Sequence, residues 1–357
     1  MRRIVRWAAW GALALVGGLV AFLVVTPMGR YLARAAYEES RILLRRQPLE
    51  VIAADSLSPP DVRQRLRLVL DARAHAESAL GLRAGESFTT YSRVDHDTLV
   101  LVLSVAYRDR LEPVRWWFPV VGRVPYKGFF DFAAAERARA DFEQRGFDTY
   151  LRPASAFSTL GWFNDPLLST TLAQGPRSLA NTVIHELAHN TLFVRNHVEF
   201  NESFASFVGA RGAADFFRAR GDEESARLVE LEWEDDKLLG RFWEALKGSI
   251  DSAYAAWPTD SAARVRARDE VYASARRTLV DSVGPILKTV PAARLERVRL
   301  DNAALLARRV YAAQLPLFDE IWMRSGRSVR ATIDRVTELT RDSDAPFEAL
   351  RDWLQRP

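Results

Sequence analysis

The distribution of apolar and polar positions separates the beginning of the chain from everything that follows. Residues 7–25 are a run of 19 uncharged, mostly apolar residues. As a helix that rises about 1.5 Å per residue, this run can cross the roughly 30 Å hydrocarbon core of a bilayer once. No polar face interrupts the run, which disfavours the buried first helix of a soluble domain. The pattern therefore predicts one N-terminal transmembrane helix from Trp7 to Val25.

The charges beside this run indicate its orientation. Arg2, Arg3 and Arg6 precede it, and basic residues tend to remain on the cytoplasmic side. A cleaved signal peptide is the alternative. Against cleavage, the run is longer than a usual signal core, and the nearest small-x-small site, Ala33-Arg34-Ala35, lies beyond it and carries a charge. We expect an uncleaved single-pass anchor, with residues 1–29 forming the cytoplasmic tip and the span.

After the anchor, helical spacing gives way to short strands and then returns. Apolar positions within residues 30–85 recur at helical spacing, with a break at Ser58-Pro59-Pro60, and predict a helical stalk. From there to about residue 172 the chain is rich in β-branched and aromatic residues, which predicts a small sheet. Its expected strands are 98–107, 116–130 and 149–160, with a helix over 132–145.

Helical spacing dominates the rest of the sequence. Gly175-Pro176 introduces a predicted helix over 177–194, and another helix is expected to begin near Asn201, whose side chain can cap it. Residues 221–357 show helical spacing with breaks near Pro258 and Gly326. The pattern predicts a predominantly helical α+β fold, with an α+β core at 86–220 and a helical C-terminal region at 221–357.

Composition excludes several classes of function. The 50 basic and 46 acidic side chains leave a net charge of +4 without a basic stripe, so no nucleic-acid partner is expected. The absence of cysteine excludes a disulfide framework, a Cys-type zinc finger, a thiol nucleophile and a lipid-modified N-terminal cysteine. Because the chain has only five histidines, their positions are informative.

Two of these histidines stand four residues apart around a glutamate. Within Val183-Ile184-His185-Glu186-Leu187-Ala188-His189, the pattern H-E-x-x-H falls where a helix is expected. Residues four apart lie on one helix face, so both imidazoles can reach one metal ion. Glu186 lies beside that face, where a carboxylate can take a proton from a metal-bound water. The pattern predicts a Zn²⁺ site with His185 and His189 as ligands and Glu186 as general base.

A catalytic zinc usually has three protein ligands and leaves its fourth position to water. The metzincin pattern is excluded, because it requires Gly at 192 and His at 195, where this chain has Leu192 and Arg195. Glu202, near the start of the next expected helix, is the preferred third ligand because a helix positions a ligand better than a loop does. Glu199 and His197 compete for this role. His75 and His96 lie in unrelated contexts.

Taken together, these residues resemble a known family. The H-E-x-x-H motif, followed after twelve residues by Glu202 in Phe-Asn-Glu-Ser-Phe-Ala, is similar to the family of putative zinc-dependent aminopeptidases of proteobacteria, a gluzincin-like group. Residues 118–130 and 157–170 also carry the resemblance, and 301–305 with Tyr311 and 316–318 echo it more weakly. The resemblance implies a zincin-like fold, with His185, His189 and Glu202 as zinc ligands and Glu186 as general base.

The chain departs from this family pattern in two respects. Family members often begin as lipoproteins with a cysteine, whereas here an apolar span takes that place and changes the anchoring. A G-x-M-E-N segment, with which one group of zinc aminopeptidases captures a free α-amine, is also missing. The span and the arginines before it predict a bacterial inner-membrane protein with its catalytic part in the periplasm. The C-terminal region is expected to close the active-site cleft.

Three further residues are candidates for substrate binding, and two tyrosines for catalysis. In H-E-x-x-H peptidases an extended substrate commonly pairs with an edge strand above the metal helix, and residues 154–162 are the candidate strand. Gly161 permits close backbone approach, Trp162 can line a side-chain pocket, and Asp165 can attract a substrate amine. For the oxyanion of the tetrahedral intermediate, Tyr311 is the candidate donor and Tyr126 the alternative.

The sequence thus predicts a membrane-anchored zinc metallopeptidase that hydrolyses peptide or protein substrates with a metal-activated water, as an aminopeptidase. Two alternatives stay open. One is a zinc endopeptidase with the same site. The other is a non-catalytic periplasmic protein that binds zinc for structure, although such a site has no need of Glu186 and tends to close its fourth position. Nothing in the sequence indicates the oligomeric state.

Overall fold

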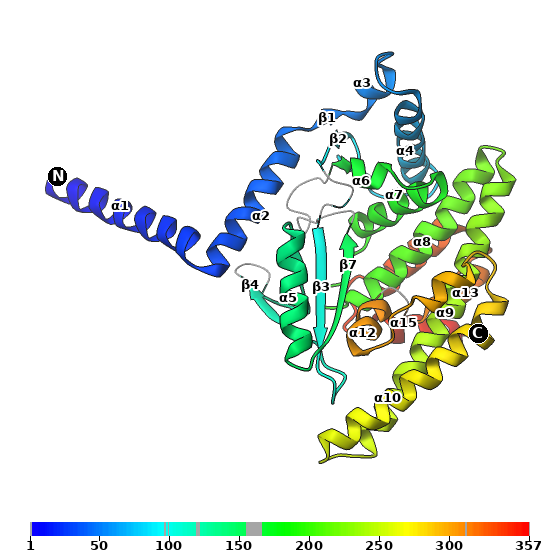
Figure 1. Ribbon diagram of the computed structural model, residues 1–357. Coiled ribbons are helices and arrows are strands. Elements are labelled where there is room, and N and C mark those ends of the chain that lie inside the picture. Colours follow the sequence, from blue (N-terminus) through cyan, green and yellow to red (C-terminus); the bar gives the residue numbers. More distant parts are fainter. Residues whose placement is uncertain are drawn as a thin grey trace.

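The computed structural model describes residues 2–95, 98, 100–118, 122–154, 166–310 and 313–356 (Figure 1). These residues form a mostly helical α+β protein with small sheets. The helices are α1 (Arg2–Val25), α2 (Pro27–Leu44), α3 (Leu49–Ala54), α4 (Pro60–Ser78), α5 (Phe132–Gln144), α6 (Ser169–Leu172), α7 (Pro176–Thr191), α8 (Val198–Ala219), α9 (Glu223–Ala255), α10 (Ser261–Arg277), the π-helix η1 (Thr278–Val283), the 3₁₀-helix η2 (Gly284–Ile286), α11 (Ala292–Glu296), α12 (Asn302–Arg309), α13 (Leu315–Arg324), α14 (Val329–Thr340) and α15 (Pro346–Gln355).

The strands of the described residues make three small sheets. They are β1 (Gln47–Pro48), β2 (Thr90–Ser92), β3 (Val100–Ala106), β4 (Trp116–Phe118), β5 (Gly122–Val124), β6 (Tyr126–Phe129), β7 (Asp148–Ala154) and β8 (Leu167–Leu168). The largest sheet is antiparallel with the order β6-β3-β7, and α5 connects β6 to β7 as predicted. A second sheet has the order β1-β2-β8, in which β2 and β8 are parallel, and β4 pairs with β5 as a hairpin.

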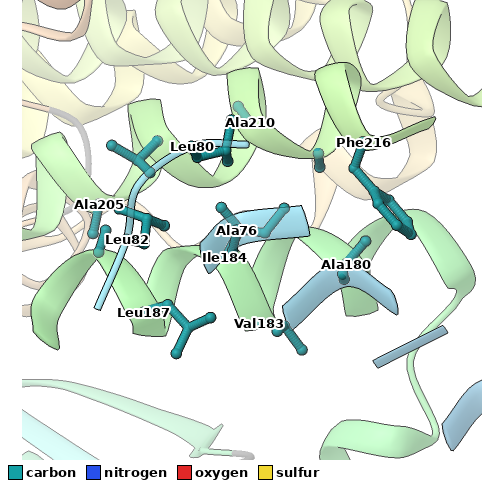
Figure 2. Packing of buried hydrophobic residues seen from close by; sticks show 14 of the residues in the cluster. Ala76, Leu80, Leu82, Ala180, Val183, Ile184, Leu187, Ala205, Ala210 and Phe216 are labelled. Carbon is teal, nitrogen blue, oxygen red and sulfur yellow. The ribbon is translucent and has the colours of Figure 1, made fainter. Parts of the chain in front are cut away.

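The main hydrophobic core surrounds α7 and α8. Alanines and larger apolar side chains from α4, the segment after it, α7 and α8 pack together in this core (Figure 2). The buried residues that Figure 2 labels in this contact are Ala76, Leu80, Leu82, Ala180, Val183, Ile184, Leu187, Ala205, Ala210 and Phe216. Residues 30–85 were predicted to form a helical stalk. Helix α4, in the second half of this segment, packs on the main core instead of standing apart from it. Its buried face, with Leu66 and Val69, packs on the core.

The far side of α8 carries an aromatic core. Phe200, Phe204 and Phe207 lie on α8 with ring centroids 5.9 to 6.0 Å from that of Phe318 on α13. Phe347 of α15 adds an edge contact to Phe200 at 5.3 Å. The three helices nearest the C-terminus therefore complete the core behind α8, since buried residues of α13, α14 and α15 all belong to the same cluster.

A buried polar network joins the β6-β3-β7 sheet to the C-terminal helices. Arg268 of α10 pairs with the Asp148 carboxylate at the start of β7, with Nη2 and Oδ2 2.9 Å apart. The backbone N–H of Asn302 donates to the same carboxylate, and its side-chain amide donates to the carbonyl of Tyr107 at 2.7 Å. Burial raises the pKa of Asp148, while the Arg268 charge lowers it. The network fixes α12 against the sheet, and it gives the Asp301-Asn302 sequence a structural role.

The N-terminal helix α1 projects away from the rest of the molecule and meets α2 at a sharp corner (Figure 1). Within the described residues, no single helix is long and apolar enough to cross a membrane by itself. Leu13–Val25 and Pro27–Leu44 have the required length and composition only together, and they are bent by 94°. The helix over residues 7–25 exists in the structure, and its role as a membrane span remains a prediction.

Candidate metal centre

The helix that carries the H-E-x-x-H motif forms at the predicted place, as α7. It begins at Pro176, whose missing N–H would be unsatisfied in the first turn in any case, and ends at Thr191. One face, including Leu179, Val183 and Leu187, is completely buried in the core. His185 and His189 lie on another face, with 16% and 21% of their side chains exposed. The core therefore fixes α7 and presents both imidazoles beside solvent.

The turn between α7 and α8 is held by Asn201. Its side-chain Oδ1 accepts from the N–H of Val194 and its Nδ2 donates to the carbonyl of Val194, both at 2.8 Å. Asn201 is completely buried and lies within the first turn of α8, which begins at Val198. The prediction that Asn201 caps this helix is therefore wrong. Because its amide fixes the preceding turn, the next residue, Glu202, is placed facing α7.

A glycine sets the distance between α7 and α8. A Cβ at Gly209 would lie 2.5 Å from Oδ1 of Asn181 and 3.1 Å from both the carbonyl oxygen of Asn181 and Cβ of His185. Only a residue without a side chain fits this crossing without displacing α7. Sequence reasoning missed Gly209 and assigned Asn201 the wrong role. An isolated glycine within a helical pattern is a signal that could have identified Gly209, because such a glycine usually has a packing reason.

The crossing of α7 and α8 brings together three side chains that could hold a metal ion. Ligand atoms of His185, His189 and Glu202 all lie within 4.8 Å of one another. Nε2 of His185 is 3.4 Å from Oε2 of Glu202, and Nε2 of His189 is 3.7 Å from Oε1. Ligand atoms about 2.0 to 2.1 Å from a tetrahedral zinc ion stand roughly 3.4 Å apart. Two imidazole nitrogens and a carboxylate at these separations fit a zinc ion with an open fourth position.

The electrostatics of this group keep its carboxylate ionised. Burial opposes the charge on Glu202, but the imidazoles of His185 and His189 outweigh burial and lower its pKa to about 2. Burial likewise opposes a charge on His189, whereas Glu202 and, more weakly, Glu186 raise the pKa of this imidazole. An ionised carboxylate is the form that binds a metal. Glu186 itself is exposed on α7, between the two histidines in sequence.

The two competing candidates for the third ligand lie outside this group. His197 immediately precedes α8, and Glu199 lies in the first turn of that helix. The Glu199 carboxylate faces the C-terminal region, where Nη1 of Arg309 lies 3.6 Å from it. Arg309 also pairs with Glu244 of α9 at 3.3 Å. Among the described residues, Glu202 is therefore the carboxylate that joins the two histidines.

Tyr126, the alternative oxyanion donor, lies on the edge strand β6 within the electrostatic reach of the metal group. Partial desolvation raises the pKa of its hydroxyl, the positive charge of Arg152 lowers it, and the negative charge of Glu202 raises it. Tyr126 and Arg152 lie on the two outer strands of this sheet, β6 and β7, with β3 between them. The other predicted residues, Tyr311, Gly161, Trp162 and Asp165, lie outside the described residues, as does His96.

Comparisons with known proteins place the chain in a family. A family model described as "Putative aminopeptidase" matches residues 30–349, which is most of the chain. The chain therefore belongs to this family. No curated protein and no solved structure matches it.

Proposed function

We propose that this member of the putative aminopeptidase family is a zinc-dependent peptidase that uses His185, His189 and Glu202 as metal ligands. The proposal rests on one observation above all: side chains from two different helices converge with the separations that a tetrahedral zinc ion requires. The α+β architecture with a motif helix beside a small sheet supports a zincin-like fold.

The side chains of this site divide the work of peptide hydrolysis. When bound, zinc supplies a Lewis acid that makes a water molecule reactive toward a carbonyl at neutral pH. Glu186 takes the proton from the attacking water and transfers it to the leaving nitrogen as the peptide C–N bond breaks. Its exposed position on α7 suits a group that must reach substrate without binding the metal. Tyr126 is proposed to donate a hydrogen bond to the oxyanion.

The family name supports cleavage at a free N-terminus, and we propose an aminopeptidase on this ground. Matched peptides test it, one with a free N-terminus and one acetylated. An aminopeptidase loses activity on the acetylated peptide, because the substrate amine is part of what it recognises. Equal cleavage of both peptides would show an endopeptidase that uses the same site.

We further propose that α1 anchors the enzyme in the bacterial inner membrane with its catalytic part in the periplasm. The support is the apolar run from Trp7 to Val25, the arginines before it, and the solvent-exposed apolar side chains of α1, such as Leu15 and Val25. Without a bilayer, this exposed apolar surface would lie in water.

Zinc content tests the ligand assignment. The full-length protein in detergent should contain about one zinc ion per chain, and His185→Ala should lose it. His197→Ala is a matched control, because this histidine lies close in sequence but outside the metal group. A His185→Ala variant that kept its zinc, measured by atomic emission, would refute the assignment.

The general base is tested separately from metal binding. Glu186→Gln should retain zinc and lower kcat by about 100-fold or more, since general-base catalysis contributes that much. Glu199→Gln is the control, because this carboxylate pairs with Arg309 and not with the metal group. Normal turnover by Glu186→Gln would show that another group takes the proton.

A further inference from the structure

The corner between α1 and α2 is built by specific residues. Thr26 accepts a hydrogen bond from the N–H of Gly29 at 2.9 Å and so caps α2, while Pro27 occupies its first turn. Arg30 donates to the carbonyl of Val25 at 3.1 Å, which satisfies the C-terminal end of α1. A Cβ at Gly29 would lie 2.0 Å from the carbonyl oxygen of Phe22. The 94° bend is therefore specified by the sequence and is not a loose joint.

One face of α2 packs on the rest of the protein. Tyr31 lies with its ring centroid 5.4 Å from that of Phe118 on β4. Ile42 is buried with Val100 and Val102 of β3, and its carbonyl accepts from Ser92 at 2.8 Å. These contacts hold α2 along the sheet, so its orientation relative to the body is fixed.

The opposite face of α2 has no packing partner among the described residues. Its exposed residues recur at helical spacing and are Arg30, Ala33, Ala36, Tyr37, Ser40 and Leu44. Figure 1 shows α1 leaving α2 on the side away from the sheet, so α1 and the body lie on opposite sides of α2. Leu44 is 84% exposed and Tyr37 55% exposed. This face is therefore open to an external partner and offers it an aromatic ring and an aliphatic side chain.

Arginines border this face. The guanidinium groups of Arg34 and Arg41 lie 5.8 and 5.5 Å from the ring centroid of Tyr37. Arg45 and Arg93 join them around a small hollow, in which Glu38 and Asp95 are the acidic residues. Arg34 and Arg41 pair with Glu38, and Arg41 and Arg45 pair with Asp95. These two carboxylates cannot neutralise four guanidinium groups, so the border keeps a positive charge that attracts anions. Arginine beside an aromatic ring is a combination typical of the membrane interface.

From these observations we propose that the outer face of α2 lies flat on an anionic phospholipid surface. The proposal rests on the membrane anchor proposed above. If α1 runs along the bilayer normal, the 94° corner places α2 parallel to the surface. The outer face of α2 then meets the lipid headgroups, and its arginines pair with lipid phosphates. This contact holds the catalytic body at one orientation above the bilayer.

Because the chain has no cysteine, spin labels can be attached at single introduced cysteines. The full-length protein in nanodiscs that contain phosphatidylglycerol would carry a label at Leu19→Cys on α1, Ser40→Cys on the outer face of α2, or Ser249→Cys, which is exposed on α9. Collision rates with oxygen and with a nickel chelate report the depth of each label. We expect Leu19→Cys in the hydrocarbon, Ser40→Cys at headgroup depth and Ser249→Cys in water.

The outcomes separate the proposals. The first outcome is a label at Ser40→Cys that is as accessible to nickel as the label at Ser249→Cys, while the label at Leu19→Cys is buried in the bilayer. This result would overturn the interfacial role of α2 and leave the anchor intact. A water-exposed Leu19→Cys label would refute both the anchor and this inference. Peptidase activity of the same samples tests catalysis independently of either result.

Charge is tested by a further pair of variants in the Ser40→Cys background. Arg34→Gln should reduce the ratio of bilayer-bound to free α2 by about fivefold, as expected for one arginine near an anionic surface. Arg137→Gln on α5 is the control, because its side chain is also exposed on a helix, 71% against 56% for Arg34, but lies outside this face. No difference between the two variants would overturn the pairing of these arginines with lipid phosphate.

Discussion

Replacing Gly209 by alanine would add a single methyl group at the crossing of α7 and α8. The new Cβ would stand 2.5 Å from Oδ1 of Asn181, closer than real carbon atoms approach. This side-chain oxygen can rotate away. The carbonyl oxygen of Asn181 and Cβ of His185, both 3.1 Å away, belong to the fixed part of α7. The two helices must therefore separate by a few tenths of an ångström.

Two effects of this substitution on stability oppose each other, the higher helix propensity of alanine and the overpacking of the helix crossing. Alanine is favoured over glycine in a helix by about 0.5 to 1 kcal/mol, whereas overpacking costs about 1 to 3 kcal/mol. We expect a net loss of about 1 kcal/mol in the free energy of unfolding. Zinc affinity should be affected more than stability, because the distances between zinc and its ligand atoms can change by only about 0.2 Å. Since changes around a metal centre typically weaken it 10- to 100-fold, we expect zinc affinity to fall about tenfold.

Zinc affinity would be measured by competition with a chromophoric chelator, and stability by urea denaturation. The matched control is Gly248→Ala on α9, where an added Cβ meets nothing within 4 Å. This control should gain about 0.5 to 1 kcal/mol from helix propensity and leave zinc affinity unchanged. If Gly209→Ala bound zinc as tightly as the control, the helix crossing would not set the geometry of the site.

Three other changes have definite expected outcomes. Asp319→Asn should cost about 3 kcal/mol in urea denaturation, because Asp319 accepts from Arg211 at 2.7 Å and Trp233 at 3.0 Å and pairs with Lys237. Without it, both partly buried cations keep only the exposed Glu234 as an anion, and a loss below 1 kcal/mol would contradict this. Free zinc at 100 times its Kd should stabilise the folded protein by about 2.7 kcal/mol, so removing the zinc should lower Tm by about 4 °C. Identical melting curves with and without zinc would argue against a site in the folded protein. Tyr126→Phe should retain zinc and lower kcat by about 100-fold if its hydroxyl binds the oxyanion, whereas unchanged kcat would exclude that role.

The sequence predicted those parts of the site that depend on local periodicity. His185 and His189 had to share one face once α7 formed, because four residues make about one helical turn. The preference for Glu202 over Glu199 and His197 rests on the expectation that a helix holds a ligand more rigidly than a loop. In the structure both carboxylates lie on α8, and what separates them is the direction each faces, toward α7 or toward Arg309.

The parts that sequence reasoning could not predict depend on contacts between distant segments. The role of Asn201 is set by a backbone turn that precedes it, and the role of Gly209 by the approach of another helix. The second half of the predicted stalk belongs to the main core for the same reason. Apolar spacing on α4 predicts a helix with one buried face but does not name the helices that bury it.

The aromatic core behind α8 has a consequence for the order in which the protein can become functional. A chain leaves the ribosome from its N-terminus, so α8 is complete long before α13 and α15 have been made. Until those last segments arrive, Phe200 and Phe204 have no partner on the side of Phe318 and Phe347. Glu202 lies on this same helix between them. The proposed metal site is therefore expected to become ordered only after α13 and α15 have been made and have packed on α8.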